Sequence, residues 1–155
     1  EMSGYISKIC KARFVDLRPI KTNLKNLEVQ NGDILNLPFN NDSLPSLSCL
    51  HVVEHIGLGR YGDKINPQGT KEACSELGRV LAKGGYLYFS TPIGKERICF
   101  NAHRIHPPQR IISYFNDLKL LSFSVVDDGG NFHENTNCNK YAKLNYGCGM
   151  FLFSK

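Results

Sequence analysis

The sequence predicts an α/β fold with a three-layer, doubly wound and mostly parallel sheet, formed as one domain over residues 1–155. Two observations predict it. Short apolar runs alternate along the chain with segments of helical periodicity, and Gly, Pro and Asn residues separate them. The composition is that of one globular domain, because 41% of the residues are hydrophobic and 21% are charged. In such folds the ligand lies beyond the carboxyl ends of the strands, so polar residues at those ends are the candidate site residues.

Charge and cysteine content exclude several classes of protein. Lys and Arg number 19 against 14 Asp and Glu, a net charge of +5, and they are scattered along the chain, so we expect no nucleic-acid partner. No apolar run approaches the roughly 20 residues of a membrane-spanning helix, so we expect no membrane span. The six cysteines are spread out with no close pair, which favours free thiols and a cytoplasmic location.

The first third of the chain predicts one short helix and three strands. The helix covers residues 2–9, and the strands cover residues 13–16, 27–30 and 47–52. The turn sequence Asn31-Gly32-Asp33 ends the second strand.

Residues 67–83 carry the clearest helical pattern of the chain. Ala73, Leu77 and Val80 form one apolar stripe at helical spacing. The pair Gly84-Gly85 predicts a left-handed stop at the end of this helix.

The remaining sequence predicts three strands, one helix and a long loop. Residues 86–90 are almost wholly apolar, which is typical of a strand buried on both faces. A helix is expected over residues 107–115 and strands over residues 118–126 and 149–153, with a polar loop over residues 127–140.

Two acidic residues follow neighbouring strands in this prediction. Asp16 is placed to accept hydrogen bonds from both hydroxyls of a nucleoside ribose. Asp33 is placed to accept from an adenine amino group, with Ile34 as an apolar wall, and His51 follows the third strand. The alternative for Asp16 is a turn or helix-cap aspartate with no ligand.

Four strings of residues then carry a resemblance to known enzymes: residues 14–16, 32–39, 46–48 and 76–85. In these strings the chain resembles class I S-adenosylmethionine-dependent methyltransferases. The resemblance implies a Rossmann-like fold and S-adenosylmethionine as cofactor, bound by Asp16, Asp33, Ile34 and His51. The strings His51–Asp63 and Phe100–Arg104 are similar to the bacterial methyltransferase-like family catalogued as domain of unknown function 268.

The chain departs from the methyltransferase pattern before Asp16. Those enzymes begin with a central strand and a Gly-rich loop, whereas no strand followed by Gly-x-Gly precedes Asp16. The first strand of the fold, which would lie between the strands carrying Asp16 and His51, is therefore missing. We expect the 155 residues to be an N-terminally truncated part of a longer protein.

Four residues are the catalytic candidates: Glu54, His55, His103 and Arg104. A neutral histidine has a reference pKa of about 6.5, which suits His55 or His103 to take a proton from an acceptor hydroxyl. Arg104 is suited to an anionic part of the acceptor. The sequence therefore predicts methyl transfer to a small-molecule or glycan-like acceptor.

Two other functions compete with this prediction. The first is a non-catalytic methyltransferase-like domain that binds a nucleoside ligand or nothing. The second is a zinc hydrolase, because His51-Val-Val-Glu54-His55 matches the pattern His-x-x-Glu-His. That chemistry needs a helix bearing both histidines, and Gly57 and Gly59 oppose a helix here, so we expect no metal site.

Overall fold

The chain forms two compact units. The computed structural model describes residues 2–18, 21–99 and 101–155. Unit 1 comprises Glu1–Pro38 and unit 2 comprises Phe39–Lys155. Phe100, which begins one of the strings named above, lies outside the described residues.

Unit 1 holds a short helix and a two-stranded parallel sheet. The helix α1 covers Met2–Ile6, and the strands β1 (Ala12–Asp16) and β2 (Leu27–Asn31) pair in parallel. Asp16 lies opposite Asn31 in this register, so the carboxyl ends of both strands lie at the same end of the sheet.

Unit 2 is built on a five-stranded mixed sheet in the order β3-β4-β9-β7-β8. Its strands are β3 (Leu44–Leu50), β4 (Leu81–Ile93), β7 (Lys119–Val126), β8 (Phe132–His133) and β9 (Gly147–Ser154). The strands β3 and β4 run parallel, while β9, β7 and β8 add antiparallel pairs beside them.

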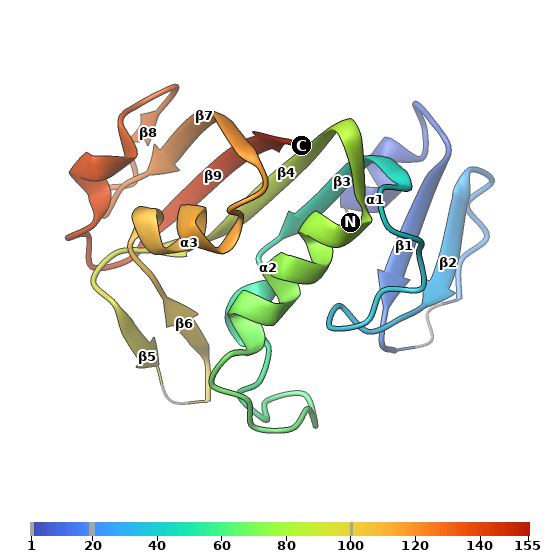
Figure 1. The fold of residues 1–155 in the computed structure, drawn as a ribbon, viewed down its shortest axis with the longest axis horizontal. Helices are drawn as coiled ribbons and strands as arrows, with labels where there is room; N and C mark the ends of the chain where they lie inside the picture. Colours follow the sequence, from blue (N-terminus) through green and yellow to red (C-terminus); the bar gives the residue numbers. More distant parts are fainter. Residues whose placement is uncertain (1, 19–20, 100) are drawn as a thin grey trace. The chain divides into compact units, whose positions relative to one another are not determined.

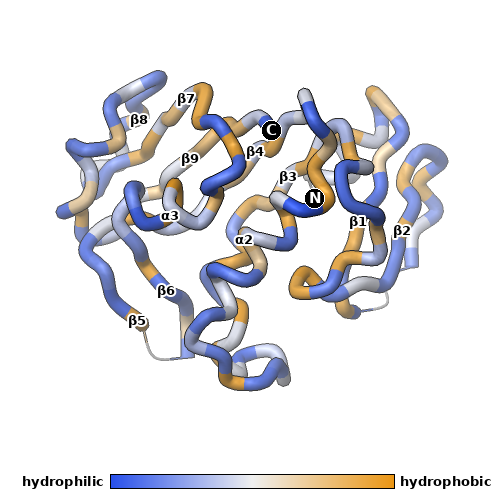
Figure 2. Tube along the Cα trace, in the orientation of Figure 1, coloured by the Kyte–Doolittle hydropathy of each residue, from blue (hydrophilic) through white to orange (hydrophobic). Residues whose placement is uncertain are grey.

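Two helices cover one face of this sheet. Figure 1 shows α2 (Gly69–Val80) and α3 (Pro108–Tyr114) in front of the strands. Along α2, hydrophilic and hydrophobic residues alternate (Figure 2), as expected for a helix with one buried side. The predicted stripe of Ala73, Leu77 and Val80 is confirmed, since all three side chains are buried.

Smaller elements connect the strands. The 3-10 turns η1 (Val53–His55) and η2 (Cys138–Tyr141) follow β3 and β8, and the hairpin of β5 (Arg97–Cys99) with β6 (His103–Ile105) lies between β4 and α3. None of these was predicted, because each is too short to show periodicity. No helix in the described part of the chain is long and apolar enough to cross a membrane.

Two local predictions were wrong. The helix α2 ends at Val80 and the chain becomes extended at Leu81, so Gly84 does not end the helix. Gly84 instead has a φ of 76° at the register shift between β3 and β4. The strand β4 is also not buried on both faces throughout, because Tyr86 is 46% exposed and Tyr88 is 50% exposed. Only one face of this part of the sheet is covered.

Candidate functional site

In unit 1, Asp16 lies at the end of β1 as predicted, and its carboxylate is held locally. Arg18 donates from Nε to Oδ1 at 3.0 Å and from Nη2 to Oδ2 at 3.1 Å, and its backbone N–H donates to Oδ1. These hydrogen bonds hold the pKa of Asp16 below its usual range. The Asp16 carboxylate is therefore ionised at neutral pH and already accepts from a neighbouring side chain.

Asp33 and Ile34 follow β2 at the same end of the sheet. The backbone N–H of Gly32 donates to the carbonyl of Asp16 at 3.1 Å, which joins the two strand ends. One carboxylate oxygen of Asp33 accepts from the backbone N–H of Leu35 at 2.9 Å, and Asp33 and Ile34 are both half-buried. The structure thus brings the predicted Asp16 and Asp33 to the carboxyl-terminal end of the same sheet.

In unit 2, the candidate residues gather where β3 ends. His51 has a φ of 54°, a backbone conformation that non-glycine residues rarely adopt. The turn η1 follows, and the hydroxyl of Thr70 in α2 donates to the carbonyl of Val53 at 3.0 Å. The N-terminal turn of α2 therefore fixes the position of Glu54, whose side chain is only 2% exposed.

His51 is hydrogen-bonded through both ring nitrogens. Its Nδ1 lies 3.1 Å from Oε1 of Glu54, and its Nε2 lies 3.2 Å from Sγ of Cys148 in β9. These contacts, first with Cys148 and then with Glu54, raise the pKa of His51 to about 10. The raised pKa makes the ring of His51 a stronger proton acceptor than an ordinary imidazole.

His55 is oriented by a backbone carbonyl from a distant part of the chain. Its Nδ1 lies 2.7 Å from the carbonyl oxygen of Ala102, which requires a proton on Nδ1. In the neutral ring the proton-free nitrogen is then Nε2, which lies 3.9 Å from Oε1 of Glu54. Nη1 of Arg60 also donates to the Ala102 carbonyl, at 3.0 Å, so this oxygen accepts from both side chains. His55 thus has a nitrogen that can accept a proton.

His103 lies on β6 and faces two other rings. Its ring centroid is 6.3 Å from that of His55 and 5.2 Å from that of Tyr146. Burial lowers the pKa of His103, so this imidazole is neutral at neutral pH. The structure therefore brings together Glu54, His55 and His103 of the four predicted catalytic residues.

Arg104 points elsewhere, although it follows His103 directly. The residue is 4% exposed, and its Nη groups donate to the backbone carbonyls of Ile56, Gly57 and Asn66. It also donates to the hydroxyl of Thr70 at 3.2 Å. Arg104 therefore ties β6 to the loop that follows η1.

A cavity of about 320 Å³ lies beside this loop. Its walls are mostly apolar, with a polar edge at Asn101 and Arg104. It is lined by Gly57, Leu58, Ile65, Pro67, Ile98, Asn101 and Arg104. A cavity of this size suits a small molecule.

The helix that the zinc pattern requires does not form. Only Val53–His55 is helical, as a three-residue 3-10 turn, and His51 precedes it in a left-handed conformation. Over the residues that the structure describes, no three His, Cys, Asp or Glu side chains are grouped as metal ligands.

Sequence reasoning missed two residues of this cluster, Cys148 and Tyr146. Tyr146 directly precedes the last strand, β9, and Cys148 is the second residue of that strand. Cys148 lies 97 residues beyond His51 in the sequence. No local pattern marks either residue, and only the pairing of β9 with β4 brings them to the end of β3.

Comparison with known proteins identifies the fold. The model of a family described as "Caenorhabditis protein of unknown function, DUF268" matches residues 35–142. This description does not confirm the bacterial family that the sequence suggested. Among curated proteins, none matches the chain.

Solved methyltransferase structures share this fold at low sequence identity. The N-methyltransferase NodS from Bradyrhizobium japonicum, solved with S-adenosyl-L-homocysteine, has a TM-score of 0.63 and 14% identity over 97% of this chain and 70% of that chain. A TehB-like SAM-dependent methyltransferase from Corynebacterium glutamicum has a TM-score of 0.59 and 14% identity over 99% of this chain and 73% of that chain.

The same fold also occurs in an enzyme named for a different reaction. The [4+2]-cyclase SpnF has a TM-score of 0.59 and 12% identity, and the match covers 84% of this chain and 57% of SpnF. The chain thus spans little more than half of that protein. The predicted α/β, Rossmann-like methyltransferase fold is confirmed by these similarities.

Proposed function

The chain belongs to the DUF268 family, and we propose that it contributes to S-adenosylmethionine-dependent methyl transfer to a small-molecule or glycan-like acceptor. The observation that carries the proposal is the placement of Asp16 and Asp33 at one end of a parallel strand pair, in a chain with a methyltransferase fold. In α/β folds the carboxyl ends of such strands hold the ligand.

The residues of this strand end fit the cofactor chemically. A carboxylate at Asp16 accepts from the two ribose hydroxyls, and Asp33 accepts from an adenine amino group with Ile34 against the ring. His51, at the end of β3, is proposed on the cofactor side as well. When bound, the cofactor supplies a methyl group on a positively charged sulfur.

His55 is the better placed of the two candidate bases. Its Nδ1 is occupied by the Ala102 carbonyl, so Nε2 accepts the proton that an acceptor hydroxyl loses. The nearby carboxylate of Glu54 stabilises the imidazolium that results. His103, neutral and close to His55, is the second candidate.

For Arg104, the hydrogen bonds favour a positioning role over the expected contact with an anionic acceptor. Its guanidinium would have to leave backbone carbonyls of the η1 loop to reach a ligand. By holding that loop, Arg104 shapes the wall of the 320 Å³ cavity, which we propose as the acceptor site. The apolar walls favour a small molecule with an apolar part over a glycan.

A non-catalytic domain is the second candidate function. The observation that favours it is that Arg18 already donates to both Asp16 carboxylate oxygens, so a ribose would compete with these hydrogen bonds. The six free thiols suit a reducing compartment, and we propose a cytoplasmic location.

Calorimetric titration with S-adenosylhomocysteine tests the proposal, in the protein as its gene encodes it. Asp16→Ala should weaken binding about tenfold or more, because a hydrogen bond to a charged group contributes roughly 1.5–3 kcal/mol. The matched control is Glu28→Ala, which removes another carboxylate paired with an arginine in the same unit. Equal affinity of the wild type and Asp16→Ala would exclude the ribose contact. Absence of binding in the wild type would favour the non-catalytic domain.

A further inference from the structure

Cys148, His51 and Glu54 form a continuous chain of hydrogen bonds in unit 2. Sγ of Cys148 lies 3.2 Å from Nε2 of His51, and Nδ1 of His51 lies 3.1 Å from Oε1 of Glu54. The three residues come from β9, from the end of β3 and from η1. A thiol, an imidazole and a carboxylate in this order are the parts of a base-activated cysteine nucleophile.

We propose that Cys148 is a nucleophile, with His51 as the base that takes its proton and Glu54 as the carboxylate that orients His51. The site would react with a carbon electrophile that carries a leaving group. This activity goes beyond the proposed methyl transfer and needs no bound cofactor.

The tautomer required for this role follows from the contacts. Glu54 accepts from Nδ1–H of His51, which leaves Nε2 to accept the proton of the Cys148 thiol. The side chain of Glu54 is 2% exposed, and its Oε2 is buried without a hydrogen bond to the described residues. A buried carboxylate with so few donors is stabilised by a positive charge on His51.

The thiol and the imidazole are also accessible. His51 is 43% exposed in its side chain, and Cys148 is half-buried. The raised pKa makes His51 a stronger acceptor for the thiol proton, and an imidazolium formed beside a cysteine favours its thiolate form. A small electrophile in solution can therefore reach the sulfur of Cys148 beside its proposed base.

The covalent step needs no reactant other than the electrophile. The Sγ proton moves to Nε2 of His51, and the Sγ electron pair forms a bond to the electrophilic carbon. The bond between that carbon and its leaving group breaks, and the leaving group departs with the electron pair. Iodoacetamide releases iodide in this way, and p-nitrophenyl acetate releases p-nitrophenolate.

The other cysteines provide internal controls. Cys99 and Cys138 are half-buried like Cys148, whereas Cys49 and Cys74 are buried in the core. Native protein is treated with limiting iodoacetamide at neutral pH, and modification at each cysteine is measured by peptide mass spectrometry. Cys148 should react about tenfold or more faster than Cys99 and Cys138, since the thiolate is the reactive form.

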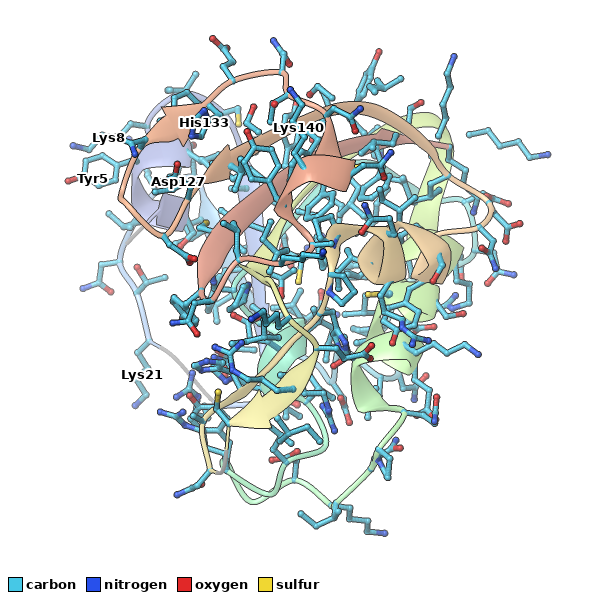
Figure 3. All side chains as sticks on the ribbon, turned by 90° about the vertical axis from the view of Figure 1, so that its left-hand side faces the viewer. Tyr5, Lys8, Lys21, Asp127, His133 and Lys140 are labelled. Atoms are coloured by element: carbon cyan, nitrogen blue, oxygen red, sulfur yellow. The ribbon has the colours of Figure 1, made fainter. Side chains whose placement is uncertain are left out.

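The variant His51→Asn tests the role of the base. Asparagine tolerates the left-handed backbone of His51 but cannot act as a base, so Cys148 should then react within about twofold of Cys99. The matched control is His133→Asn, because His133 also pairs with a carboxylate, Asp127, at 2.7 Å, and the two side chains lie close together in Figure 3. This control should leave the reactivity of Cys148 unchanged.

The proposal stays testable if His51→Asn does not fold. Modification of Cys49 and Cys74 would report the loss of structure, and Glu54→Gln, which keeps the shape of the side chain, would then be used. Equal reactivity of Cys148, Cys99 and Cys138 in the wild type would overturn the proposal, as would fast reaction of Cys148 in a folded His51→Asn variant. Acetylation of Cys148 by p-nitrophenyl acetate supports an acyl electrophile, and alkylation without acetylation supports an alkyl one.

Discussion

The candidate residues of the two units are held in place in opposite ways. In unit 1, Asp16 is bound by Arg18 and Asp33 by the backbone of Leu35, each only two residues further along the chain. In unit 2, His51 contacts Cys148 across 97 residues, and His55 contacts Ala102 across 47. The carboxylates are therefore organised by local sequence and the histidine cluster by the tertiary fold. Loss of tertiary packing should disturb the second set much more than the first.

The largest effect is expected on the rate of methyl transfer, once an acceptor is identified. His55→Ala should lower turnover at saturating cofactor roughly a hundredfold to ten-thousandfold, the usual loss for a general base. His103→Ala tests the second candidate in the same assay. Steady-state kinetics would separate turnover from cofactor affinity. If both variants keep near wild-type turnover while cofactor affinity falls, the two histidines shape the site and neither is the base.

A large effect on stability is expected at Arg104, where contacts connect distant segments. Arg104→Met would remove charged donors from the carbonyls of Ile56, Gly57 and Asn66, and in the described part of the chain only the last two also accept from a backbone N–H. Hydrogen bonds to charged groups contribute roughly 1.5–3 kcal/mol each, so the free energy of unfolding should fall by at least about 2 kcal/mol. Denaturant titration followed by circular dichroism measures this change.

Arg18→Met in unit 1 is the matched variant for Arg104→Met. Arg18 is 73% exposed in its side chain and pairs with a carboxylate two residues away, so its loss should cost about 0–1 kcal/mol. Similar losses of stability in the two variants would contradict the distinction between residues held by local contacts and residues held by tertiary contacts.

The smallest effect is expected at His106, which is buried beside α3. Burial lowers its pKa, although Glu96 lies 3.4 Å from its Nδ1 and opposes the shift. Arg104 and Arg110 also disfavour its charge, and the ring of Tyr114 packs against it. The unfolded chain therefore binds this proton more tightly than the folded chain, and stability should fall as the pH drops below the reference value of about 6.5.

Thermal melts across this pH range test the His106 prediction. His106→Gln has no titrating ring at this position. Between about pH 7.5 and about pH 5.5, its melting temperature should therefore fall by less than that of the wild type. An identical loss in the two proteins would mean that His106 binds its proton equally well in the folded and the unfolded chain.

Much of the fold was determined by the sequence alone, because its signals are local. The apolar stripe of α2, the end of β1 at Asp16 and the turn that follows β2 each depend on residues close together in the chain. The motif strings likewise led to a methyltransferase fold that the solved structures share. Such features arise from periodicity and turn chemistry, which neighbouring residues specify.

The tertiary structure decided what these residues do within the site. Arg104 and His103 are adjacent in sequence, yet one is buried among carbonyls and the other faces His55, because successive side chains of a strand point to opposite faces. Cys148 meets His51 only because β9 pairs antiparallel with β4, next to β3. Strand order and register set these contacts, and both depend on packing between distant segments that no local pattern encodes.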